Sequence, residues 1–138
     1  MYFRPSADIK STGYFFSNIT TLAPGNIDII RNYVTDAGQY GMYLNTVLGT
    51  SAKPLNLNNN LSAGGFYNNF SNAPTNTFDA AQTPVGLFLS TVGWANVVFN
   101  SVLMDAPTKT GTVDNTTAFY INGAPGTGSL YIYNNIFQ

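Results

Sequence analysis

Short apolar or alternating runs, separated by turn-forming residues, make up most of the chain. Turn signals such as Pro24-Gly25-Asn26 and Asn122-Gly123 recur roughly every 8 to 15 residues, a spacing typical of all-β sandwiches and barrels. We therefore expect an all-β fold, a single antiparallel β-sandwich or jelly roll of about eight strands. The clearest strands are predicted over residues 39–48, 85–92, 95–104, 117–121 and 129–136, and weaker ones over 13–20, 55–57 and 66–70.

The uncharged run 85–104 allows two interpretations. It is long enough for a transmembrane helix, but its second half alternates between apolar and polar residues, as a half-buried strand does. We therefore expect two core strands joined near Gly93-Trp94, and no membrane span. The apolar parity contains Ala95, Val97, Phe99 and Leu103, and the other parity contains Asn96 and Asn100.

Residues 26–37 fit two kinds of element. Ile27, Ile30, Val34 and Ala37 have helical spacing, and Asn26 is a suitable N-cap. The same residues also read as a β-rich strand. We expect one short helix here, within an otherwise all-strand domain.

The chain divides into an arm and one domain. Residues 1–12 are polar and are predicted to form an extended N-terminal arm, and residues 13–138 a single β-sandwich domain. No apolar segment follows Met1, so we expect no signal peptide. The Asn-rich region 57–83 is predicted to be an ordered surface loop held by its aromatic residues. No convincing internal repeat is evident.

Charged residues make up only 8% of the chain, and the net charge is −1, whereas about a quarter of residues are charged in ordinary domains. A net charge close to zero promotes association. The five basic residues are spread along the sequence, so there is no basic patch of the kind that nucleic-acid binding requires. We expect no nucleic-acid partner.

The residues available for catalysis are few. The chain has no His, no Cys and no Glu, which excludes the common triads and most transition-metal sites. A pair of Asp carboxylates is the one catalytic arrangement that stays open, and we expect no enzyme, no catalytic residue, no cofactor and no metal. The Gly-rich segment 123–129 resembles a phosphate-binding loop but lacks its Lys, so we expect it to close a hairpin between 117–121 and 129–136.

The aromatic residues are the remaining feature, with ten Phe, nine Tyr and one Trp. Most should fill the core, but Tyr and Phe are also enriched at protein interfaces. Tyr131 and Tyr133 share one face of a predicted strand whose other face carries Leu130 and Ile132. The predicted interface residues are Tyr2, Phe3, Arg4, Phe66, Tyr67, Phe70, Tyr131 and Tyr133.

The polar arm, the eight or so strands and a chain that ends directly on a strand are together similar to the small jelly-roll capsid and penton-type vertex proteins of icosahedral viruses. That resemblance implies a structural subunit of a virion, made in the host cytoplasm, whose partners are copies of itself and other shell proteins. The alternative is a carbohydrate- or receptor-binding module at the cell surface or outside the cell: a lectin-like head, an adhesin or a fibre tip. In that case region 57–83 would hold the glycan site.

Overall fold

The computed structural model describes residues 12–20, 26–35, 37, 40–64, 85–104, 117–123 and 128–138. Within these ranges every regular element is a strand, so the predicted all-β character is confirmed for the described residues. The strands are β1 (Thr12–Thr20), β2 (Ile27–Ile30), β3 (Tyr33–Thr35), β4 (Tyr40–Leu48), β5 (Leu55–Asn58), β6 (Leu61–Gly64), β7 (Val85–Val92), β8 (Ala95–Val98), β9 (Ser101–Met104), β10 (Thr117–Asn122), β11 (Leu130–Tyr133) and β12 (Ile136–Phe137).

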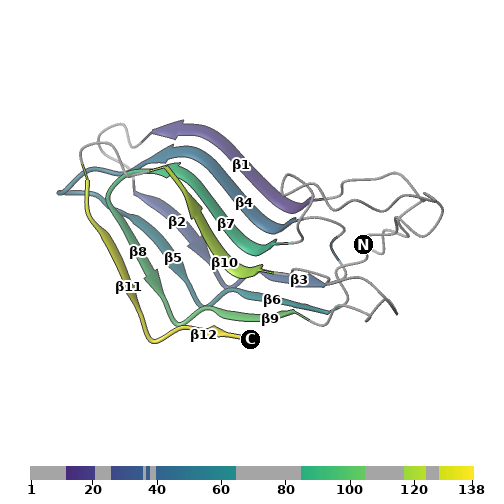
Figure 1. The fold of residues 1–138 in the computed structure, drawn as a ribbon. Coiled ribbons are helices and arrows are strands. Elements are labelled where there is room, and N and C mark those ends of the chain that lie inside the picture. Colours follow the sequence, from purple (N-terminus) through teal and green to yellow (C-terminus); the bar gives the residue numbers. More distant parts are fainter. Residues whose placement is uncertain are drawn as a thin grey trace.

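The strands form three parallel sheets around one core. We name them sheet A (β1-β4-β7-β10), sheet B (β2-β5-β8-β11) and sheet C (β3-β6-β9-β12). Each successive set of three strands passes once through sheets A, B and C and makes one coil, so the described chain makes four coils (Figure 1). The architecture is a parallel β-helix, in which each coil stacks on its neighbours.

The prediction of an antiparallel jelly roll is wrong, because all nine strand pairings are parallel. Alternation with a period of two reports that a strand has one buried face and says nothing of the direction of its neighbour. The predicted hairpin between 117–121 and 129–136 is also wrong, because β10 lies in sheet A and β11 lies in sheet B, so the two strands do not pair. Val85–Val92 and Ala95–Val98 are joined at Gly93-Trp94 as expected, but they also lie in different sheets.

A residue with positive φ turns the chain from sheet B to sheet C in every coil. These residues are Arg31 (φ 58°), Asn59 (55°), Phe99 (56°) and Asn134 (54°). A single left-handed residue bends the backbone sharply and changes which parity faces inward. Asn follows each of them in the sequence.

That turn corrects three predictions. The expected helix over 26–37 is instead β2, the turn at Arg31, and β3. The expected strand 95–104 is divided into β8 and β9, and the parity changes at Phe99: Ala95 and Val97 are fully buried, whereas Phe99 and Leu103 are exposed and Asn100 is buried. The predicted strand 129–136 is likewise interrupted at Asn134.

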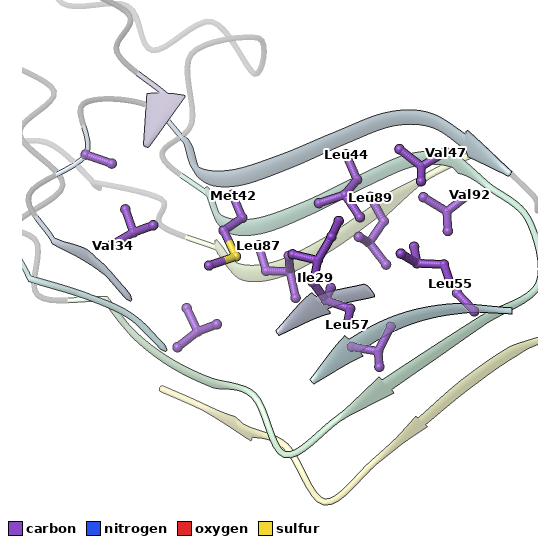
Figure 2. Packing of buried hydrophobic residues seen from close by; sticks show 14 residues of the cluster. Ile29, Val34, Met42, Leu44, Val47, Leu55, Leu57, Leu87, Leu89 and Val92 are labelled. Atoms are coloured by element: carbon purple, nitrogen blue, oxygen red, sulfur yellow. The ribbon is translucent and has the colours of Figure 1, made fainter. Parts of the chain in front are cut away.

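The core consists of columns of apolar side chains that repeat from coil to coil. Leu44 and Leu89 of sheet A point toward Leu55 and Leu57 of sheet B, and all four are fully buried (Figure 2). Burying one such side chain stabilises the fold by about 1.5–3 kcal/mol. The hydrophobic effect therefore holds the sheets together, while the strand ladders and the Asn side chains at the turns fix the register.

Glycine occurs where sheets A and C approach each other. A Cβ atom at Gly41 would meet the Ser62 side chain and the backbone oxygen of Gly86, and one at Gly86 would meet Val102. Only a residue without a side chain fits such an approach. The interior is consequently narrow at the junction of sheets C and A, which is where each coil passes to the next.

Several predicted features lie outside the described residues. Residues 1–11 of the predicted arm and the predicted strand 66–70 are among them. The first described strand already begins at Thr12. Among the described residues, no helix is long and apolar enough to cross a membrane.

Candidate contact surfaces

An aromatic row crosses the outer face of sheet A. Phe15, Tyr43, Phe88 and Tyr120 hold matching positions on its four strands. The centroids of successive rings are 5.1, 4.6 and 5.2 Å apart, within the range of favourable aromatic pairs. Tyr40 joins the row, at 5.0 Å from Tyr43 and 5.4 Å from Phe88.

The row packs its rings against one another. Tyr43 and Phe88 are nearly parallel, with an interplanar angle of 12°, so each ring lies with one face against the other. Only the rings at the two ends, Phe15 and Tyr120, lack a ring on one side within the row, and they are 58% and 46% exposed. The row therefore stabilises the stacking of the coils and forms an apolar ridge.

Tyr40 has a raised pKa. Burial of its phenol raises the pKa above 10.0, and the neighbouring Tyr43 raises it further. Both causes act in the same direction because each disfavours the phenolate. Tyr40 is therefore a neutral hydroxyl across the physiological range.

Neutral polar residues run beside the aromatic row. Ser17, Asn45, Ser90 and Asn122 hold matching positions two residues further along the strands of sheet A. Side chains two positions apart on a strand point to the same face of the sheet. The outer face of sheet A thus combines an apolar ridge with a row of uncharged hydrogen-bonding groups.

Sheet B carries a polar row on its outer face. Asn96 Nδ2 donates to Asn56 Oδ1 at 3.0 Å, and Asn56 Nδ2 donates to Asp28 Oδ1 at 2.7 Å. Tyr131 holds the matching position on β11. Asp28 is the only Asp among the described residues, and its carboxylate is part of this row and faces no second acid.

An asparagine ladder occupies the turns between sheets B and C. The backbone N–H of each Asn donates to Oδ1 of the Asn in the next coil: Asn32 to Asn60 at 3.0 Å, Asn60 to Asn100 at 3.0 Å, and Asn100 to Asn135 at 2.8 Å. The side chains also donate back, since Nδ2 of Asn60, Asn100 and Asn135 bonds a carbonyl of the preceding coil. These groups satisfy one another's hydrogen bonds. Because every backbone N–H in the ladder donates toward the next coil, the ladder has a direction along the helix axis.

Sheet C exposes apolar side chains. Tyr33, Leu61 and Ile136 hold matching outward positions, together with the polar Ser101, and Leu103 is exposed two residues after Ser101. The polar Ser101 lies between Leu61 and Ile136 in this row. Sheet C is therefore a second apolar outer face.

The predicted interface residues separate into two groups. Tyr131 and Tyr133 lie on β11, point outward as expected and are 54% and 52% exposed. Leu130 packs against the core, as the alternation indicated. The others, Tyr2, Phe3, Arg4, Phe66, Tyr67 and Phe70, lie outside the described residues.

The described residues offer little for acid–base or metal chemistry. Within the described ranges, no three acidic residues form a group that could hold a metal ion. Asp28, Arg31 and Lys53 are the charged side chains in those ranges. What this surface can do is make contacts through aromatic, aliphatic and amide groups.

The aromatic row and the asparagine ladder were missed in the sequence. Their spacing is irregular, because matching positions are 28 residues apart for Asn32 and Asn60, 40 for Asn60 and Asn100, and 35 for Asn100 and Asn135. A search for a constant period therefore finds no repeat. The one feature that the four turns share in the sequence is an Asn between two short apolar runs.

Comparisons with known proteins add no family to this description. The chain matches no protein-family model, no curated protein and no solved structure.

Proposed function

We propose that this chain is a structural subunit of a protein assembly and that it acts through protein–protein contacts. The observation that carries the proposal is the apolar exterior of the coils. Large aromatic and aliphatic side chains are exposed on sheets A, B and C, among them Phe15, Tyr33, Tyr131 and Ile136. Exposed apolar side chains that gather on a protein surface favour contacts with other proteins.

Charge supports the same function. The net charge of −1 gives little repulsion between copies. Among the described residues, only Asp28, Arg31 and Lys53 carry a charged side chain. A protein meant to stay dispersed would usually place charges where this chain places Tyr, Ile and Asn.

The nature of the assembly is a separate matter. The likeness to jelly-roll capsid and vertex proteins assumed antiparallel sheets, and the parallel sheets remove that structural basis. A shell and a virion location remain predictions of the sequence, and the proposal keeps only the assembly role. A β-helix also suits an elongated fibre or stalk, because coils stack along one axis.

Light scattering tests the proposal. The solution mass of the wild-type protein is measured across a concentration series. We expect discrete oligomers or concentration-dependent growth in the wild type. A mass equal to that of one chain at every concentration would overturn the assembly role.

A glycan-binding module is the second candidate, and one observation favours it. The neutral polar row of Ser17, Asn45, Ser90 and Asn122 lies beside aromatic rings, a combination that suits sugar hydroxyls. Against it, the inner rings of the row cover one another and leave only Phe15 and Tyr120 with a free face. A glycan array that shows binding abolished by Tyr120→Ala would establish this function; a folded sample without binding would exclude it.

A further inference from the structure

The four coils have two different ends. Strands β1, β2 and β3 form one edge of the three sheets, and β10, β11 and β12 form the other. Each edge strand pairs with one described strand, whereas the strands of the two inner coils pair with two. An edge strand offers unpaired N–H and C=O groups, and natural proteins usually protect such an edge with charges. The described residues of the last coil contain no charged side chain.

Inward-facing apolar side chains are exposed at these ends. Ile132 shares a column with Leu57 and Val97, which are both 0% exposed, yet Ile132 is 39% exposed. At the other end Tyr14 shares a column with Met42, and its exposure is 38% against 1%. Both ends therefore expose the core itself.

The asparagine ladder makes the two ends complementary. At each inner step an Asn backbone N–H donates forward to the next Oδ1, and an Asn Nδ2 donates back to a carbonyl of the column of Ile29 and Leu57. The last coil thus ends on the N–H of Asn135 and the carbonyl of Ile132, and the first coil ends on Oδ1 and Nδ2 of Asn32. The N–H of Asn135 is a donor that fits Oδ1 of Asn32 in another copy. The carbonyl of Ile132 is an acceptor that fits Nδ2 of the same Asn32.

The aromatic row leads to the same pairing. Phe15 and Tyr120 are its end rings, and both are exposed. A first coil stacked on a last coil would place Phe15 of one copy beside Tyr120 of the other. Joining two like ends would instead set strands antiparallel and align donor with donor in the ladder.

We propose that copies of this chain stack head to tail, with the first coil of one copy (β1, β2 and β3) continuing the parallel sheets beyond the last coil of another (β10, β11 and β12). Asn32 of one copy follows Asn135 of the other in the ladder, and Asp28 follows Tyr131 in the outer row of sheet B. The contact is heterologous, so it propagates into a filament unless a rotation closes it into a ring. This inference rests on the assembly role and names its occupant as a second copy.

A cysteine pair tests the register. The chain has no Cys, so the double variant Asp28→Cys/Tyr131→Cys contains only the two new thiols. Within one chain these positions are three strands apart in sheet B, about 14 Å at about 4.8 Å per strand, which exceeds the roughly 7 Å that a disulfide spans. Between stacked copies they are neighbours. Under mild oxidation we expect a series of covalent oligomers from the double variant and none from either single variant.

Other occupants of the ends give other results. Dimers from Tyr131→Cys alone would mean that like ends meet, and would overturn the proposal. A monomeric sample in which the thiol introduced by Tyr131→Cys is protected from a maleimide would mean that the chain covers its own end, with the same consequence. Growth of the solution mass without cross-linking of the double variant would refute head-to-tail stacking and leave the assembly role intact; no growth would refute both.

A lysine at the end supplies an independent measurement. Ile132→Lys places a charge among the exposed core side chains of the last coil, and Leu103→Lys places one on an outer face of an inner coil. We expect Ile132→Lys to reduce the mass at the highest concentration to that of one chain, and Leu103→Lys to leave end-to-end growth unchanged. Circular dichroism establishes that both variants are folded. The reverse pattern would assign assembly to the outer face of sheet C.

Discussion

The side chain of Asn100 holds the coil before it through the side chain and backbone of Asn60. Asn100 Oδ1 accepts from Asn60 N at 3.0 Å and from Asn60 Nδ2 at 2.9 Å, and both residues are buried. Nδ2 of Asn100 in turn donates to the carbonyl of Leu57 at 2.7 Å. One amide thus forms hydrogen bonds with three groups that are buried between coils.

Removing that amide should be costly. Asn100→Ala leaves the Asn60 N–H and the Leu57 carbonyl buried without these partners, and each such group costs about 1–3 kcal/mol. We expect a loss of about 3–5 kcal/mol in the free energy of unfolding, measured by urea denaturation. Asn96→Ala is the matched control, since Asn96 lies on the outer face of sheet B; its cost should stay below about 1 kcal/mol. Equal losses for both variants would contradict the ladder.

Core truncations should depend on the coil that carries them. Leu89 is fully buried in an inner coil, and its replacement by Ala should cost about 2–5 kcal/mol. Ile132 faces the same core from the last coil but is 39% exposed, so Ile132→Ala in a monomeric sample should cost less than about 2 kcal/mol. Thermal or urea unfolding of the two variants measures the difference. A larger loss for Ile132→Ala would mean that the last coil is covered.

Ser62 should tolerate loss of its hydroxyl. Its side chain is buried opposite Gly41, and Oγ has no hydrogen-bond partner among the described residues. Ser62→Ala removes the unpaired group, and we expect the free energy of unfolding to stay constant or rise by about 1 kcal/mol. Gly41→Ala, across the same junction, should destabilise the protein instead, because its Cβ meets Ser62 and the Gly86 backbone. A clear loss of stability in Ser62→Ala would show that the hydroxyl has a partner.

Alkaline pH should act on Tyr40. Its pKa is raised in the folded protein, chiefly by burial, so the folded state binds the phenolic proton more tightly than the unfolded state. The stability due to this group is complete below the unfolded pKa of about 10 and is lost as the pH rises through the folded value. Stability measured between pH 8 and 11 should therefore fall less steeply in Tyr40→Phe than in the wild type. If stability fell with pH equally steeply in both proteins, Tyr40 would not contribute to the loss of stability at alkaline pH.

The sequence predicted the longer strands, missed short ones such as β3 and β6, and gave the wrong pairing, for a physical reason. Val85–Val92 was recognised because its apolar residues report local burial. Nothing in that local pattern states whether the next strand returns alongside or turns into another sheet. The decisive residues were those with positive φ between sheets B and C. Asn59 and Asn134 are of a type that usually marks left-handed backbone, but Arg31 and Phe99 are not. An Arg or a Phe there hides the turn.

The candidate surfaces were predictable only in part. Tyr131 and Tyr133 point outward because alternation within one strand is a local property. The aromatic row depends on residues 28, 45 and 32 positions apart, from Phe15 through Tyr43 and Phe88 to Tyr120. Only the coil register brings them together, and connections of unequal length between the strands conceal that register in the sequence.

All of these surfaces depend on the coil register, which a disulfide within one chain tests most directly. Asn56 and Asn96 hold neighbouring positions on β5 and β8 of sheet B, 40 residues apart, and their side chains are hydrogen-bonded at 3.0 Å. In Asn56→Cys/Asn96→Cys we predict that mild oxidation yields a monomer with an internal disulfide, detected by mass spectrometry after proteolysis. Asp28→Cys/Asn96→Cys, two strands apart at about 9.6 Å, should not bridge within one chain. Failure of the first pair to bridge, or equal bridging by both, would contradict the parallel β-helix.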